Sequence, residues 1–118
     1  PALTEETGKL FSALTGGKYD RMLLDRQMDV MAGETAEPAL RPGGYLSAGT
    51  QDALYLALRL AVCRLALPAE TPVVLDDALV CFDDTRLRRA LDALQFEAQT
   101  RQILLLTCQS REENILHP

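Results

Sequence analysis

Two short apolar runs on either side of a helical segment limit the fold of this chain more than any other feature. The runs are Val73–Leu75 and the centre of Gln102–Thr107, and the segment between them, from about Asp84 to Ala98, has the apolar spacing of a helix. Strand, helix and strand in this order predict a right-handed crossover between two parallel strands. Because parallel strands are usually covered on both faces, the sequence predicts an α/β fold with flanking helices.

The most helix-prone segment follows the stretch LSAGTQ at residues 46–51. We expect a helix over Thr50–Ala66, which carries apolar residues on almost every side and should be largely buried. Ser47 or Thr50 can cap its start with a side-chain oxygen. The first N–H groups of a helix have no partner inside it and can also bind an external anion. On its own the stretch favours a plain helix cap over a phosphate site.

The N-terminal part of the chain has weaker patterns. Thr4–Leu14 predicts a short helix that ends at the glycine pair of residues 16 and 17. Tyr19–Met31 predicts two short strands joined by a tight turn at Asp25–Gln27. Gly33–Gly44 is rich in Gly, Pro and Ala and is predicted to be a loop.

Composition restricts the classes of function. With 118 residues, 47% of them apolar, the chain can bury one core. A net charge of −5 argues against a nucleic-acid binder that uses its whole surface. No apolar run is long enough to cross a membrane, and the start lacks the pattern of a signal peptide. We therefore expect a cytoplasmic protein without a membrane partner. The first residue is Pro1 rather than Met, which suggests a processed, truncated or excised piece.

Cysteine and histidine usage narrows the chemistry further. Cys63, Cys81 and Cys108 are odd in number and lie among apolar residues, which predicts reduced, buried thiols rather than disulfides or a zinc site. His117 is the only histidine and lies next to the end of the sequence, so chemistry that needs an internal imidazole is nearly excluded.

Paired carboxylates point to the most specific chemistry. Asp76 and Asp77 follow the first apolar run, at the carboxyl edge where parallel sheets bind ligands. Adjacent carboxylates in apolar surroundings repel one another and lose hydration, which costs free energy unless they hold a cation or transfer a proton. In a Mg²⁺-nucleotide site, one carboxylate holds the metal and its neighbour deprotonates the attacking water. A helix cap or a solvated turn is the alternative. In the second pair, Asp84 is expected to cap the following helix, which leaves Asp83 in the turn to face a partner.

The order LSAGTQ, buried helix, VVLDDALVCFDD and ILLLTCQ resembles the C-terminal lobe of an ABC-type P-loop ATPase head. The branch it resembles is the SMC-like one that includes the SbcC-type DNA-repair ATPases, and the match covers roughly Tyr45–Ser110. The resemblance implies parallel strands with flanking helices, preceded by a short helix and a hairpin. It also implies site roles. The signature residues would contact, in trans, the γ-phosphate of ATP bound to the opposite subunit; they are Ser47, Ala48, Gly49 and Thr50. Asp76 would bind the metal, Asp77 would be the catalytic base, Asp83 would be the D-loop aspartate, and Gln109 would take the catalytic position of the switch histidine.

The resemblance also divides the chain, which it treats as a single lobe. Residues 1–44 correspond to the helix, hairpin and loop that follow the long coiled coil of this family, and residues 45–118 to the signature helix, the Walker B strand and the switch strand. No Walker A motif is present: Gly16-Gly-Lys18 lacks the earlier glycine and is followed by Tyr19 instead of Ser or Thr. We therefore expect the Walker A lobe to be an N-terminal partner and the isolated chain to be inactive.

The implied cofactors are ATP and Mg²⁺, and the implied active form is a homodimer of heads that hydrolyses ATP at its interface, in DNA repair or chromosome maintenance. A nuclease subunit and DNA are further implied partners. The residues offer little independent support for DNA contact. Arg86, Arg88 and Arg89 form a basic cluster, but such a run is more often a solvated helix face.

Two departures from the family pattern keep other interpretations open. Asp77 is one methylene shorter than the usual Glu, and Gln109 replaces the histidine, although its amide can still donate a hydrogen bond. A degenerate head that binds nucleotide and clamps without hydrolysis is therefore one alternative. An ABC transporter lobe is another, which the long separation of Ser47 from Asp76 and the YLALRLAVCRLA helix disfavour.

Overall fold

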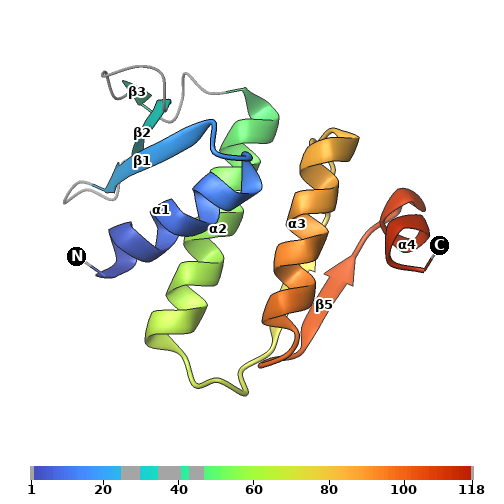
Figure 1. Cartoon of the computed structure of the whole chain (residues 1–118). Helices are drawn as coiled ribbons and strands as arrows, with labels where there is room; N and C mark the ends of the chain where they lie inside the picture. The colour runs from blue at the N-terminus through green and yellow to red at the C-terminus, as the bar shows by residue number, and fades with distance from the viewer. Residues whose placement is uncertain (1, 25–29, 35–40, 43–46, 118) are drawn as a thin grey trace.

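A computed structural model of the chain describes residues 2–24, 30–34, 41–42 and 47–117. Among the described residues, a helix and three strands come first, and helices and strands alternate from there on (Figure 1). In order, the elements are α1 (Ala2–Leu14), β1 (Tyr19–Leu24), β2 (Val30–Glu34), β3 (Arg41–Pro42), α2 (Ala48–Ala66), β4 (Val73–Asp76), α3 (Asp84–Glu97), β5 (Ile103–Leu106) and α4 (Arg111–Leu116). The predicted α/β class is confirmed, whereas α4 has no counterpart among the predicted elements.

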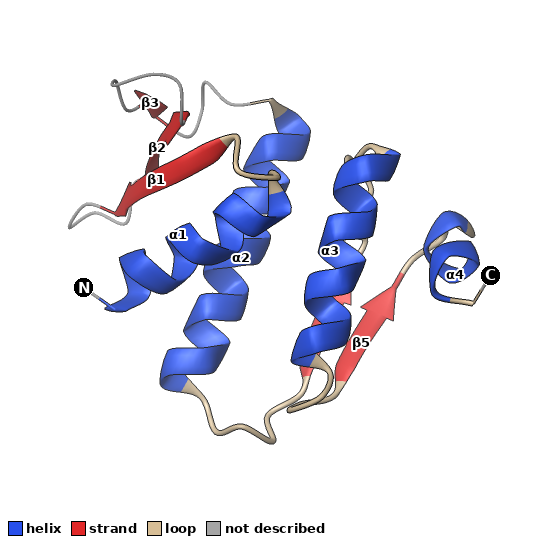
Figure 2. Cartoon of the chain, viewed as in Figure 1, coloured by secondary structure: helices blue, strands red, loops and turns tan. Residues whose placement is uncertain are grey.

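Strands β4 and β5 pair in parallel, as the strand–helix–strand pattern predicts. Val73 lies opposite Ile103 and Asp76 opposite Leu106, so both strands end at the same edge. Figure 2 shows α3 lying over one side of this pair. The prediction that both faces are covered is wrong for the described residues, because Leu104 and Leu106 are 42% and 51% exposed. Alternate strand residues point to opposite faces, and the described residues cover only one of these faces.

Helix α2 is buried on one side only. It begins at Ala48, two residues before the predicted start, and its Leu60 is completely buried. Tyr55 and Leu65 on the same helix are 57% and 50% exposed, so the prediction of a largely buried helix is wrong for that side. The exposed side opens into a groove of about 520 Å³ between α2 and β4. Its apolar surface has no cover within the described part of the chain.

The N-terminal part forms a helix and an antiparallel hairpin. Helix α1 stops where Gly16 and Gly17 take φ angles of 62° and 83°, which side chains rarely adopt. Strands β1 and β2 form the predicted pair, although β2 extends beyond the predicted range, and Met22 lies opposite Ala32. The turn expected at residues 25–27 lies outside the described residues. The predicted loop over residues 33–44 is wrong in part, because β2 continues to Glu34 and β3 pairs with its other edge.

One apolar cluster connects these elements, with buried residues from α1, β1, β2, α2, β4 and α3. The rings of Phe11 and Tyr19 pack with centroids 5.1 Å apart. Next to this cluster, Arg64 Nη1 bonds Glu6 Oε1 at 2.7 Å and Arg64 Nε bonds Glu97 Oε2 at 2.8 Å, which joins α1, α2 and α3. Partial burial lowers the pKa of Arg64, but its bonds to Glu97 and Glu6 raise that pKa by more.

The prediction that the cysteines are buried is confirmed for one of them and wrong for the other two. All three thiols are free, and Cys63 is buried, but Cys81 and Cys108 are exposed. Both exposed thiols lie beyond the ends of the parallel strands, where the apolar runs leave the core. None of the helices in the described part of the chain combines the length and apolar character that a bilayer span needs.

Candidate nucleotide site

Three segments that are far apart in the sequence meet at one end of the lobe. They are the start of α2 at residues 47–50, the turn from β4 into α3 at residues 76–86, and the segment after β5 at residues 107–112. Hydrogen bonds connect the first segment to the second and the second to the third. The structure therefore brings together the segments that hold all the predicted site residues.

The start of α2 is capped by Ser47. The Thr50 N–H donates to Ser47 Oγ at 3.2 Å, which decides between the two predicted caps, and the Ser47 hydroxyl donates to Thr50 Oγ1 at 2.8 Å. Intrahelical pairing begins with the Gln51 N–H and the Ser47 carbonyl, so the N–H groups of Ala48 and Gly49 have no partner inside the helix. These two donors and the helix dipole can bind an anion.

Thr50 faces the interior of the lobe rather than solvent. It is 3% exposed, and its hydroxyl also accepts a hydrogen bond from Arg86 Nη1 at 3.1 Å. This side chain therefore supports the helix start, and a contact with nucleotide stays a prediction. Arg86 was expected on a solvated face; it is instead partly buried and reaches from α3 to α2, while Arg88 and Arg89 are exposed.

Gly49 lies where α2 approaches the following turn most closely. A Cβ atom at this position would be 2.8 Å from the carbonyl oxygen of Cys81 and 3.3 Å from Arg86 Nη1. A side chain would push the two segments apart.

The thiol of Cys81, in the turn opposite Gly49, is exposed. The side chain of Asp52 raises the pKa of this thiol by accepting its hydrogen bond and by its negative charge.

The carboxylates of Asp76, the last residue of β4, and of Asp77 are both exposed, so they do not bear the burial cost that the sequence suggested. Asp77 has a φ angle of 52°, and its N–H donates to the Leu106 carbonyl at 2.8 Å. A non-glycine residue held in this left-handed region is uncommon, and such residues gather at functional sites. The turn after β4 thus holds Asp77 in one defined direction at the edge of the sheet.

The second carboxylate pair differs from the prediction. Asp83 caps α3, since its Oδ1 accepts the Arg86 N–H at 2.7 Å, and Asp84 is the first helical residue. The expected cap at Asp84 is wrong, because Asp83 has the extended backbone that a cap needs. Asp83 remains exposed, so one carboxylate oxygen closes the helix end while the group still faces outward.

Gln109 is held by a residue that the sequence did not single out. Its Oε1 accepts a hydrogen bond from Arg111 Nε at 2.8 Å, and its backbone N–H donates to Thr107 Oγ1 at 3.1 Å. Arg111 also reaches the turn before α3, where it donates to the Phe82 carbonyl. An arginine two residues after a catalytic candidate is the only signal for this contact in the sequence.

The metal-binding capacity of the site is limited but suits Mg²⁺. The described residues contain no group of three or more His, Cys, Asp or Glu side chains arranged to hold a metal ion. Mg²⁺ bound to a nucleotide needs only one or two carboxylates, since phosphates and water complete its shell. Asp76, exposed at the end of β4, meets that requirement.

The topology defines the fold: the chain has the fold of the C-terminal lobe of an SMC-type ATPase head. It is similar to a chain from work on ATP-driven dimerization and DNA stimulated activation of SMC ATPases, with TM-score 0.79 and 15% identity over 97% of this chain and 71% of that one. An SMC head bound to the C-winged helix domain of ScpA has a TM-score of 0.78 and 16% identity, over 97% of this chain and 36% of that one. The SMC head domain from Thermotoga maritima has a TM-score of 0.73 and 19% identity, over 97% of this chain and 40% of that one.

Among curated proteins, the chain is similar to YhaN of Bacillus subtilis (strain 168), itself described as uncharacterized. The two are 34% identical over 120 residues, which is 99% of this chain and 12% of YhaN. The chain thus spans about an eighth of the length of this relative. No protein-family model matches the sequence.

Proposed function

We propose that the chain is the C-terminal half of an SMC-like head that binds and hydrolyses ATP at a dimer interface, in DNA repair or chromosome maintenance. The observation that carries the proposal is that hydrogen bonds join the capped start of α2, the turn that carries Asp76, Asp77 and Asp83, and the segment of Gln109 at one end of an SMC-head fold. The resemblance assigns these groups the parts of an ATPase site that lie outside the Walker A lobe.

The start of α2 would bind the γ-phosphate of ATP held by the opposite head. Ser47 is exposed at the helix end, and the N–H groups of Ala48 and Gly49 lie beside it. The partial positive charge at the start of a helix favours a phosphate oxygen there. Arg86, bonded to Thr50 behind the helix start, adds a full positive charge near the same place.

Asp76 and Asp77 would divide the remaining chemistry between them. Asp76 would hold Mg²⁺, which neutralises phosphate charge, through its exposed carboxylate. Asp77 would orient the attacking water and take its proton while the water oxygen bonds to the γ-phosphorus and ADP leaves. Gln109 would donate an amide hydrogen bond to the γ-phosphate, and Asp83 would face the partner head across the interface.

An N-terminal lobe with a Walker A motif is the proposed partner within each head. Strand residues Val74, Leu104 and Leu106 expose apolar side chains on the uncovered side of the β4–β5 pair, and the 520 Å³ groove beside β4 is lined mainly by apolar residues. Exposed apolar area of this kind marks an interface. A lobe that extends the two-stranded sheet would cover both.

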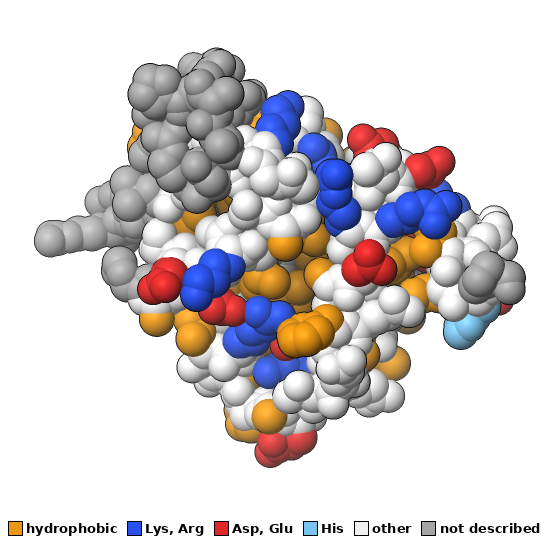
Figure 3. Space-filling model, in the orientation of Figure 1, with side chains coloured by type: hydrophobic (Ala, Val, Ile, Leu, Met, Phe, Trp, Pro, Cys, Tyr) orange, Lys and Arg blue, Asp and Glu red, His pale blue; other side chains and the backbone are white. Residues whose placement is uncertain are grey.

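A two-fold pair of such heads would bury two ATP molecules in one interface, each between one head's own Walker A lobe and the partner's α2. DNA and a nuclease subunit are part of the proposal only through the resemblance to SbcC-type proteins. Figure 3 shows basic and acidic side chains interspersed over the face it views, which offers no uniformly basic surface there.

A non-hydrolysing clamp is the second candidate, and a specific observation favours it: Asp replaces Glu at residue 77 and Gln replaces His at residue 109. Steady-state ATP hydrolysis by the complete protein separates the two candidates. Turnover that Asp77→Asn abolishes supports the ATPase, whereas Mg-ATP-dependent dimerisation without turnover supports the clamp. The transporter alternative receives no support from the SMC-head neighbours.

The decisive test places an arginine at the start of α2. Ser47→Arg puts a bulky cation where the partner's γ-phosphate and Mg²⁺ must approach, so ATP binding to the mutant's own Walker A lobe should persist while dimerisation with ATP is lost. Light scattering with and without Mg-ATP, on an Asp77→Asn background that slows hydrolysis, measures this. Gln99→Arg, an exposed change beyond the far end of α3, is the control. If the Ser47→Arg protein still dimerises with ATP, LSAGTQ acts only as a helix cap and does not contact the partner's nucleotide.

A further inference from the structure

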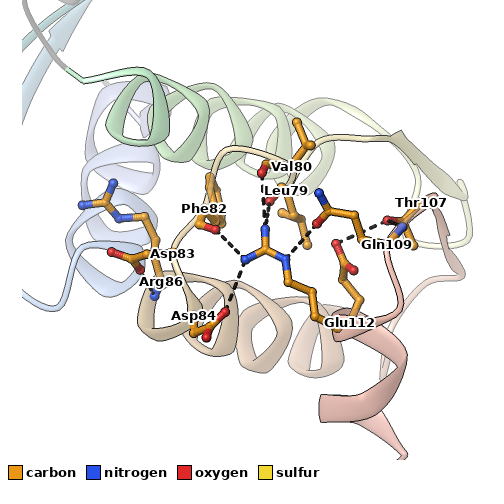
Figure 4. A network of polar contacts seen from close by, with 10 residues as sticks. Leu79, Val80, Phe82, Asp83, Asp84, Arg86, Thr107, Gln109 and Glu112 are labelled. Atoms are coloured by element: carbon orange, nitrogen blue, oxygen red, sulfur yellow. Dashed lines mark hydrogen bonds and ion pairs between the residues drawn. The ribbon is translucent and has the colours of Figure 1, made fainter.

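The guanidinium of Arg111 is the centre of the polar network at this end of the lobe. Nη1 donates to the Phe82 carbonyl at 2.7 Å, and Nη2 donates to the carbonyls of Leu79 and Val80 at 3.1 and 3.3 Å. Nε donates to Gln109 Oε1 at 2.8 Å. Figure 4 shows these groups converging from the turn before α3 and from the segment after β5. A single side chain therefore bonds both segments.

Most of this binding is to backbone and not to a charged partner. The ion pair of Arg111 with Asp84 is 3.4 Å long, and the carboxylate is 83% exposed, so it adds little. The three carbonyls belong to the turn that runs from the proposed base to the D-loop. Because the arginine fork is planar and rigid, the turn and the guanidinium hold each other in one geometry.

The bond to Gln109 decides which end of its amide can contact a ligand. Arginine has only donors, so Gln109 must turn its carbonyl oxygen toward Nε. The amide –NH2 then points away from the guanidinium and is available as a donor. A phosphate oxygen accepts and never donates, so this orientation is the one that a γ-phosphate contact requires.

We propose that Arg111 is a positioning residue that makes Gln109 a hydrogen-bond donor to the γ-phosphate and ties it to the turn carrying Asp77 and Asp83. This inference rests on the proposed ATPase function and assigns to Gln109 and Arg111 together the contact that a histidine makes in the resembled family. With Gln109 held by Arg111, the donor to the γ-phosphate is an amide N–H, which does not titrate near neutral pH.

The test is a double-mutant cycle in the complete protein with its Walker A lobe. Gln109→Ala removes the donor and should lower kcat about 100-fold, the typical loss of one transition-state donor, with KM changed less than about threefold. Arg111→Lys keeps the charge but loses the fork, and should lower kcat by up to the same factor. Arg88→Lys, at an exposed position on α3, is the matched control and should have no effect.

Non-additivity is the readout that a merely structural role would not produce. If Arg111 acts through Gln109, the double variant has the kcat of Gln109→Ala alone. If Arg111→Lys leaves kcat at the wild-type level, or lowers it by the same factor with and without Gln109, the inference is overturned.

Gln109→Glu guards against a folding defect in the Arg111 variants. It retains an acceptor for Arg111 and should hold the melting temperature, but it has no N–H to donate and should lose turnover. Wild-type kcat in this variant would overturn the inference. Asp77→Asn distinguishes a failure of the proposed function from a failure of this inference. If turnover survives Asp77→Asn, the proposed base is overturned as well. If Asp77→Asn abolishes turnover while the Arg111 variants stay active, only the inference is overturned.

Discussion

Replacing Gly49 with alanine is predicted to destabilise the lobe even without nucleotide. The added Cβ would lie 2.8 Å from the Cys81 carbonyl oxygen, whereas carbon–oxygen contacts in proteins begin at about 3.3 Å. The neighbour is backbone, so no side chain can rotate away. Either the start of α2 or the turn before α3 must move by about 0.5 Å.

The expected magnitude follows from two opposing effects. Overpacking of this kind costs about 1–3 kcal/mol, and replacing glycine by alanine inside a helix returns up to about 1 kcal/mol. The return is smaller for Gly49 because it lies in the first turn of α2. The net prediction is a loss of about 1–2 kcal/mol in the free energy of unfolding.

Gly8→Ala is the matched control. This glycine lies in the middle of α1, and its added Cβ would meet Met22 Cγ at 3.7 Å, an ordinary contact. The same substitution should therefore stabilise the lobe there by about 0.5–1 kcal/mol. The structure predicts opposite signs for two identical changes.

The assay is urea unfolding of the complete head without nucleotide, in which the shift in midpoint multiplied by the slope gives the change in stability. A lower midpoint for Gly49→Ala and a higher one for Gly8→Ala is the expected result. Equal upward shifts would mean that α2 and the turn are not in close contact. The glycine of LSAGTQ would then be needed only for the approach of phosphate.

The remaining predictions concern other parts of the lobe. Glu97→Ala should cost about 3–5 kcal/mol in urea unfolding, because it leaves two arginines without their buried carboxylate; a loss below about 1 kcal/mol would contradict this. Asp83→Ala should cost about 0.5–2 kcal/mol and Asp84→Ala less, and the reverse order would restore the cap at Asp84. Asp52→Asn should lower the pKa of Cys81 and speed its alkylation at pH 8, so an unchanged rate would refute the contact. The excised chain should self-associate in sedimentation velocity through its exposed apolar strand face; a monodisperse monomer would count against the half-head.

Local patterns in the sequence determined most of the elements. The spacing of apolar residues predicted α1, α3, β4 and β5 within a few residues of their bounds. This is possible because buried residues recur at a different spacing in a helix than in a strand. The glycine pair at residues 16 and 17 marked a helix end that a positive φ requires. The motif order from LSAGTQ to ILLLTCQ was enough to identify the SMC-head fold.

Tertiary structure decided whatever depends on residues distant in the chain. Strand β3 forms because β2 offers it an edge. Leu104 and Tyr55 are exposed because none of the described residues covers them, and no local pattern predicts this. Asp83 rather than Asp84 is the cap because the backbone of Asp83 is extended in the folded turn.

The site shows the same division. Asp76, Asp77 and Ser47 could be selected from their neighbours in sequence, since a strand end and a helix start are local features. The contact of Arg86 with Thr50 spans 36 residues and that of Arg111 with Phe82 spans 29. An arginine side chain is equally compatible with solvent and with a buried carbonyl, so only the folded chain, by bringing acceptors within reach, determines which it binds.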